Sequence, residues 1–140
     1  MKTFFYKFII LSLILIHFGC QKTSETNSLV TELIIGHWDW INTIENPRTG
    51  EETNPQVTGF TKMIVFTNNN TVEEYINYIR TNTFTYKIEI NRANPKMNVL
   101  AYNSTSTHFY FSYDTLIFNE AFVDGPVSFY KKNTQINLPN

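Results

Sequence analysis

The stretch Gly36-His37-Trp38-Asp39-Trp40 decides the fold, because from here on the hydrophobic pattern has a period of two. Trp38 and Trp40 share one face of an extended segment, and the residues between them share the other. The same alternation is cleanest in Phe84-Thr85-Tyr86-Lys87-Ile88. Half-buried antiparallel strands show this pattern. The chain is therefore predicted to be all-β from Gly36 onward.

Eight strands are predicted, joined mostly by short turns rich in Asn, Asp, Gly and Pro. They cover residues 36–44, 60–67, 71–80, 83–91, 97–102, 107–113, 115–122 and 127–132. We expect an eight-stranded antiparallel up-and-down barrel, since such a meander can close and remove its exposed edges. A β-sandwich is the alternative, but it needs longer connections. The one long connection, residues 45–58, holds three turn signals and is expected to project as a loop.

A short helix is predicted just before the first strand, over residues 29–34. Its apolar residues Leu29, Val30, Leu33 and Ile34 follow a helical spacing, and Gly36 is a typical stop. Residues 20–28 before it are expected to form a polar tether. Residues 133–140 are expected to form a flexible tail.

The N-terminus has the features of a secretory signal peptide, predicted over residues 1–19. Lys2 and Lys7 precede an apolar run over residues 8–16, which is shorter than the roughly 20 residues of a membrane-spanning helix. An uncleaved membrane anchor is the alternative.

Cys20 is the single cysteine of the chain, so an intrachain disulfide is excluded. It follows Gly19 at the end of the apolar run, and this position resembles the lipobox of bacterial lipoproteins, although His17 and Phe18 differ from it. The resemblance implies that Cys20 is lipidated with acyl chains such as palmitate and anchors the protein. An ordinary signal peptide with an incidental cysteine is the alternative.

Composition argues against several functions. Removing Lys2 and Lys7 with the leader lowers the 11 Lys and Arg to nine, against 12 Asp and Glu, a net charge of about −3. No basic patch for nucleic acid is present. His37 and His108 are too few for a zinc site, and no serine lies in a Gly-x-Ser-x-Gly elbow. We expect neither a cofactor nor enzymatic activity.

The chain resembles the lipocalin and calycin group, and more narrowly the small lipocalin-like lipoproteins of Bacteroidetes-type bacteria. The resemblance rests on Gly36 and Trp38, on Phe84-Thr85-Tyr86-Lys87-Ile88, on Asp114-Thr115-Leu116 and on Phe129-Tyr130-Lys131. It covers residues 29–132. In that group the tryptophan closes the narrow end of the barrel, and an arginine near the last strand packs on it; here only Lys131 and Lys132 stand nearby.

The interior of an eight-stranded barrel is either filled by its own side chains or holds one small ligand. Many of the residues expected to point inward are large. They are Trp38, Trp40, Ile64, Phe66, Ile76, Tyr78, Phe84, Tyr86, Ile88, Phe109, Phe111, Leu116 and Phe118. Both outcomes therefore stay open, and a large lipid is not expected to fit.

Glu73 and Glu74 are adjacent on one predicted strand, so their side chains point to opposite faces. Glu74 lies on the more apolar face and is expected to point inward. It either sits in water at the barrel mouth or forms a polar ligand site, whose candidate residues are Trp40, Glu74, Tyr78, Arg80 and Tyr86.

The function expected from these features is a monomeric, non-enzymatic lipoprotein of the bacterial cell envelope. It would be anchored to the outer membrane, facing either the periplasm or the cell surface, and would bind a small apolar or aromatic ligand at the open end. The alternative is a solid barrel that acts by surface contact, as a binding partner or inhibitor of another envelope protein.

Overall fold

The computed structural model describes residues 22–91, 94 and 97–135. The chain divides into two compact units, Met1–Leu33 and Ile34–Asn140. The predicted signal peptide and Cys20 lie outside the described residues. The elements are α2 (Lys22–Ile34), β1 (Gly36–Asn46), β2 (Glu51–Thr53), α3 (Pro55–Thr58), β3 (Lys62–Phe66), β4 (Thr71–Ile76), β5 (Ile79–Ile90), β6 (Asn98–Tyr102), β7 (Thr105–Ser112), β8 (Thr115–Asn119), η2 (Ala121–Val123) and β9 (Val127–Asn133).

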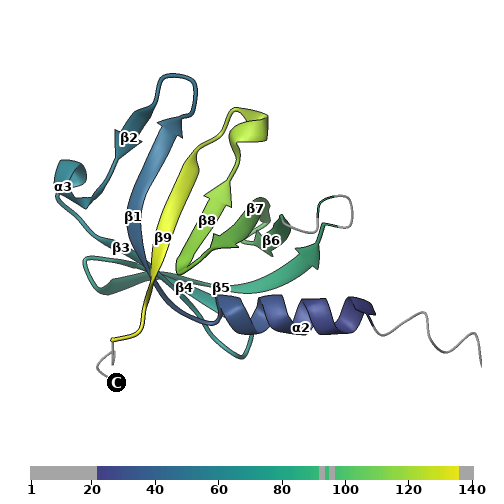
Figure 1. Ribbon diagram of the computed structural model, residues 1–140. Coiled ribbons are helices and arrows are strands. Elements are labelled where there is room, and N and C mark those ends of the chain that lie inside the picture. The colour runs from purple at the N-terminus through teal and green to yellow at the C-terminus, as the bar shows by residue number, and fades with distance from the viewer. Residues whose placement is uncertain (1–21, 92–93, 95–96, 136–140) are drawn as a thin grey trace, which may run out of the picture. The chain divides into compact units, whose positions relative to one another are not determined.

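The strands form a closed antiparallel barrel (Figure 1). Nine strands pair in the order β2-β1-β3-β4-β5-β6-β7-β8-β9, and β1 also pairs with β9. Since β2 pairs only with the end of β1, the ring itself holds eight strands. The closure runs from His37 opposite Asn133 to Ile44 opposite Val127. The predicted eight-stranded barrel is confirmed, and the β-sandwich is wrong because the first and last strands pair.

The helix before the barrel is longer than predicted. It begins at Lys22 and not at Leu29, so most of the expected tether is helical. The segment from Lys22 to Asn27 contains no glycine or proline. Nothing in it stops a helix from extending backward once the turns near Leu29 have formed.

The predicted long loop, residues 45–58, is largely ordered. β1 continues to Asn46, and a turn with Gly50 at φ +70° leads into the short strand β2. Asn54 then caps α3, because its side-chain oxygen accepts the backbone N–H groups of Gln56 and Val57 at 3.1 and 3.0 Å. Gly59 ends the helix in the left-handed conformation that glycine tolerates.

The turn between β4 and β5 lies earlier than predicted. Asn77 and Tyr78 form it, with φ values of 50° and 65°, as a tight hairpin turn of the primed type requires. The predicted turn at Thr81 and Asn82 is therefore wrong, and both residues belong to β5. β8 also ends sooner than predicted, at Asn119, because η2 follows it.

Aromatic residues fill the end of the barrel at which β1 begins. Trp38 is almost fully buried, and its Nε1 donates to the Ile34 carbonyl at 2.7 Å. Its ring lies 5.8 Å from that of Phe111, and the Lys132 ammonium lies 5.1 Å from its ring centroid. Lys132 thus makes the contact for which the sequence offers no arginine.

Most of the predicted inward residues are in the core. Eight are buried, namely Trp38, Trp40, Ile64, Phe66, Tyr86, Phe109, Leu116 and Phe118. The prediction is wrong for Ile76 and Tyr78, which are 42% and 68% exposed, because the chain already turns at Asn77. A smaller buried cluster of Met63, Val65 and Tyr75 lies on the other face of β3 and β4.

Candidate ligand site

Glu74 points into the barrel, as predicted. Its ladder partners are Ile64 on β3 and Asn82 on β5, and Ile64 is buried. Asn82 Nδ2 donates to Glu74 Oε2 at 2.9 Å. Glu73 takes the outer face, where its carboxylate accepts from the Tyr75 hydroxyl at 2.7 Å and from Arg80 Nη1 at 3.1 Å. The two adjacent carboxylates are therefore in different environments.

A hollow of about 170 Å³ lies inside the barrel beside Glu74. We name it the lumen hollow. Its polar lining includes Glu74, Tyr102, Thr107, Glu120, Ser128 and Tyr130. It is at the end where β8 leads to β9 and β1 runs out toward Asn46, since Ile44 pairs with Val127 there. This end is opposite the one that Trp38 fills.

Two tyrosines of the lumen hollow are held in the neutral form. Burial raises the pKa of Tyr102 to about 12, and the negative charges of Glu74 and Glu120 add to this effect. Burial also raises the pKa of Tyr130, helped by Tyr102 and Glu74. Both phenols therefore stay protonated around neutral pH and can donate or accept a hydrogen bond.

Thr107 lines the lumen hollow, and its buried hydroxyl has no protein partner among the described residues. The residue is only 8% exposed, and its Oγ1 makes no hydrogen bond among the described residues. Buried hydroxyls are normally bonded, because leaving one unbonded costs about 1–3 kcal/mol. The Thr107 hydroxyl lies beneath the surface of the hollow, where its missing hydrogen bond costs stability.

Glu120 reaches the lumen hollow from the connection after β8. Its backbone N–H donates to Pro126 O at 3.1 Å, and Gly125 N donates to Glu120 O at 2.9 Å. A Cβ on Gly125 would lie only 2.7 Å from Glu120 Cβ, so only glycine allows this close packing. The loop thereby fixes the backbone from which the carboxylate projects.

Trp40 is linked to the lining of the lumen hollow through a chain of hydrogen bonds. Its Nε1 donates to Thr43 Oγ1 at 2.9 Å, and Thr43 Oγ1 lies 2.9 Å from Ser128 Oγ. Thr43 is 5% exposed, so this chain of bonds is shielded from water. It holds the hydroxyl of Ser128, which lines the hollow, in a defined position.

A second hollow of about 310 Å³ adjoins the first, and we name it the rim hollow. The two share Ile64, Glu74 and Tyr130 as lining residues. Lys62 also lines the rim hollow, with its Nζ 4.5 Å from the centroid of the Trp40 ring and 5.5 Å from that of Phe60. This ammonium is thus stabilised on aromatic rings.

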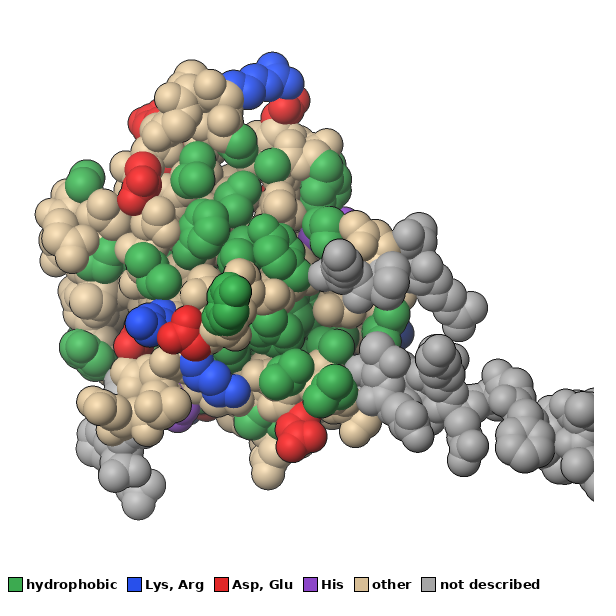
Figure 2. All heavy atoms as spheres, in the orientation of Figure 1, with side chains coloured by type: hydrophobic (Ala, Val, Ile, Leu, Met, Phe, Trp, Pro, Cys, Tyr) green, Lys and Arg blue, Asp and Glu red, His purple; other side chains and the backbone are tan. Residues whose placement is uncertain are grey.

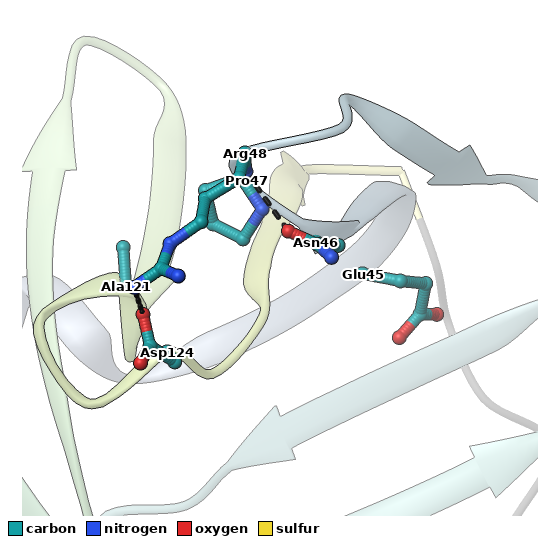
Figure 3. A pocket seen from close by; sticks show the side chains of 6 residues that line it. All are labelled: Glu45, Asn46, Pro47, Arg48, Ala121 and Asp124. Atoms are coloured by element: carbon teal, nitrogen blue, oxygen red, sulfur yellow. Dashed lines mark hydrogen bonds and ion pairs between the residues drawn. The ribbon is translucent and has the colours of Figure 1, made fainter.

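A third hollow of about 240 Å³ lies between the β1–β2 turn and η2 (Figure 3). Arg48 Nη2 and Asp124 Oδ1 form an ion pair across it at 2.7 Å. Both side chains are more than 70% exposed, at 79% and 74%. Ion pairs this exposed contribute little to stability, and the lining carries no buried polar group that would recognise a ligand.

Of the predicted ligand-binding residues, the structure places Glu74 in the lumen lining and Trp40 behind it. Tyr86 is buried, but its hydroxyl donates to Thr67 O at 3.3 Å and its ring packs edge-on against Phe66. Tyr78 is exposed at the β4–β5 turn, and Arg80 pairs with Glu73 on the outer face. The prediction that Tyr78 and Arg80 join Glu74 in one polar patch is therefore wrong.

The sequence interpretation missed Tyr102, Thr107, Glu120 and Tyr130. For Tyr130 the sequence did hold a signal. Ser128 and Tyr130 alternate with Val127 and Phe129 along the last strand, and Tyr130 pairs with the inward-facing Trp40. Glu120 gave no such signal, since its position depends on the loop that follows β8.

Two kinds of feature are absent from the described residues. They contain no group of three or more His, Cys, Asp or Glu side chains arranged to hold a metal ion. None of the helices within them has the length and apolar character needed to cross a membrane. Comparison of the chain with protein-family models, with curated proteins and with solved structures yields no match.

Proposed function

We propose that this protein is a non-enzymatic, lipocalin-like binding protein that holds a small molecule in the lumen hollow of its barrel. The observation that carries the proposal is the hollow itself, of about 170 Å³, with Glu74, Tyr102 and Tyr130 among its polar lining. Binding sites are typically concave and lined by apolar groups with a few well-placed polar ones. Ile64 and Phe118 provide apolar lining beside Glu74 and the tyrosines.

The volume restricts the ligand. The hollow has room for roughly six water molecules at about 30 Å³ each, so it suits a small molecule or the head of a larger one. The adjoining rim hollow of about 310 Å³ can take the remainder.

The test is a binding screen with a fragment library whose members are matched in size but differ in charge and polarity. We expect hits whose chemical-shift changes in the protein NMR spectrum map to Thr107, Ser128 and Tyr130. Thr107→Leu fills the hollow and should abolish these hits. Ser106→Leu, on the neighbouring exposed residue, should keep them. If no fragment binds in a manner sensitive to Thr107→Leu, the proposal is wrong.

We further propose that the protein is a lipoprotein of the bacterial outer membrane, anchored through Cys20. The support is the position of the single cysteine directly after the apolar run and Gly19. Expression of the full chain with labelled palmitate should give a labelled protein in the membrane fraction. Cys20→Ser should lose both the label and the membrane association. A Cys20→Ser protein that stays in the membrane fraction contradicts the anchor.

A second candidate function is surface contact with another envelope protein. The observation that favours it is the β4–β5 turn, where Ile76, Tyr78 and Ile79 are 42%, 68% and 71% exposed. Figure 2 also shows hydrophobic side chains gathered over the middle of one face, and exposed apolar patches often mark interaction sites. Cross-linking in intact cells should then recover a partner that is lost with Tyr78→Ser and Ile79→Ser. An unchanged cross-linking pattern counts against this function.

A further inference from the structure

The charges that face the lumen hollow all have one sign. Among the described residues, Glu74 from β4 and Glu120 from the β8–β9 connection line it, and no Lys, Arg or His does. Within the part of the chain that the structure describes, the Glu74 carboxylate accepts a hydrogen bond from a neutral amide, that of Asn82. Glu120 makes neither an ion pair nor a side-chain hydrogen bond among the residues that the structure describes. Two part-buried carboxylates in one hollow repel each other unless a positive charge enters between them.

The cation that lines the adjoining rim hollow makes its contacts with aromatic rings. Lys62 lines the adjoining rim hollow and not the lumen hollow. Its ammonium lies over the rings of Trp40 and Phe60. Arg80 is also turned away, because it pairs with Glu73 on the outer face of the barrel. Among the described residues, no cationic side chain therefore balances the two carboxylates of the lumen hollow.

The neutral groups of the lumen hollow suit an N–H-bearing cation. Tyr102 and Tyr130 present phenol rings, whose faces attract cations, and hydroxyl oxygens that accept N–H groups. An ammonium group placed here would lie beside carboxylates and phenols from β4, β6, β9 and the β8–β9 connection.

We propose that the lumen hollow selects a small organic cation, such as a primary ammonium compound, with Glu74 and Glu120 supplying the charge and Tyr102 and Tyr130 the remaining contacts. The inference rests on the proposed binding function and narrows its ligand class. A metal ion fits the lining less well, because only two carboxylates face the hollow and no third metal-binding side chain joins them within the described chain. The ligand's apolar part would extend past Ile64 into the rim hollow, which shares that residue.

The experiment compares three probes of nearly equal size: phenethylammonium, 2-phenylethanol and 3-phenylpropanoate. The protein used is the chain from residue 20 onward with the substitution Cys20→Ser. Isothermal titration should show that phenethylammonium binds at least tenfold more tightly than the alcohol, and that the carboxylate does not bind. Glu74→Gln and Glu120→Gln keep the shape of the side chain and remove its charge. Each should weaken phenethylammonium binding at least fivefold and leave 2-phenylethanol unaffected.

Glu73→Gln is the matched control, since it changes the neighbouring carboxylate on the opposite face of the same strand. It should leave the affinity for phenethylammonium unchanged. Thermal unfolding of every variant shows whether the barrel is intact. Equal binding of ammonium and alcohol, or equal effects of Glu73→Gln and Glu74→Gln, would overturn the cation selectivity while leaving the small-molecule function standing. Calcium or magnesium binding that depends on Glu74, without amine binding, would overturn it as well. If none of the three probes binds and the fragment screen also fails, the proposed function falls with it.

Discussion

At the residue scale, the two ends of the barrel differ in how their polar side-chain groups are hydrogen-bonded. Trp38 uses its only polar atom within the packed end, because Nε1 donates to the Ile34 carbonyl. At the other end Tyr102 and Tyr130 line the lumen hollow with their phenols. Buried polar groups that are bonded stabilise a fold, whereas unbonded ones cost stability and remain useful for binding. The polar groups of the second end are therefore suited to recognition.

Trp38→Phe should destabilise the protein by about 1–3 kcal/mol. The phenyl ring keeps most of the packing but leaves the Ile34 carbonyl without its donor in a buried place. Urea denaturation followed by circular dichroism measures the loss. Phe60→Leu, at a half-buried residue near the other end, should cost less. If Trp38→Phe is as stable as the unmodified protein, the hydrogen bond contributes nothing.

Alkaline pH should destabilise the protein through Tyr102 and Tyr130. The pKa of Tyr102 is raised to about 12 in the fold, above its ordinary value of about 10 in the unfolded chain. The unfolded chain therefore loses this proton first, so the contribution of Tyr102 to stability is complete below pH 10 and is lost as the pH rises toward 12. This contribution to the free energy of unfolding is at most about 3 kcal/mol. Solvent screening at this partly exposed residue makes it smaller. The raised pKa of Tyr130 acts in the same direction.

The measurement is the free energy of unfolding in urea at pH 9 and pH 11. Tyr102→Phe should reduce the difference between the two pH values, because phenylalanine has no proton to lose. Tyr113→Phe, at a fully exposed turn residue, is the control and should leave the difference unchanged. A pH dependence that is the same in both variants would show that Tyr102 is not responsible.

At the element scale, strands were predictable and turns were less so. The period of two placed β5, β6, β7 and β9 within a few residues, since one face of each strand must meet the core. The β4–β5 turn was missed because Asn77-Tyr78 is a weak turn signal. Thr81-Asn82 also contains an asparagine, so local chemistry does not distinguish the two positions. The structure decides between them through Thr61, whose backbone N–H donates to Asn77 Oδ1 at 2.9 Å. That contact joins residues far apart in the sequence, so local patterns do not reveal it.

Tyr78→Gly should stabilise the protein by about 1 kcal/mol. Tyr78 has a φ of 65°, a conformation that costs a residue with a Cβ about 1–2 kcal/mol and glycine almost nothing. Part of that gain is offset by the greater freedom of glycine in the unfolded chain. Chemical denaturation measures the gain, and ligand binding at the lumen hollow should not change, since Tyr78 is not part of its lining. A loss of stability would mean that the exposed Tyr78 ring makes contacts that outweigh the backbone strain.

At the scale of the whole molecule, closure of the barrel creates the candidate site. Glu74 and Tyr130 are far apart in the sequence and line the same hollow only because β9 returns to pair with β1. The inward position of Glu74 was predictable from its strand alone. The residues around Glu74 were not predictable. Tyr102, Glu120 and Tyr130 reach it through the register and stagger of the strands, which local sequence patterns do not reveal.

Removing β9 should therefore destroy both the fold and the site. A chain ending at Asp124 leaves the facing edges of β1 and β8 without partners, and unpaired edges of this kind promote aggregation. A chain ending at Gln135 keeps every pair of the β1–β9 ladder and should remain folded. Size-exclusion chromatography and far-ultraviolet circular dichroism distinguish the two: the shorter chain should aggregate or lose its strand signal, and the longer one should match the full-length protein. A soluble, folded chain that ends at Asp124 would show that closure by β9 is dispensable, and its binding of phenethylammonium would then show that the site does not need Tyr130.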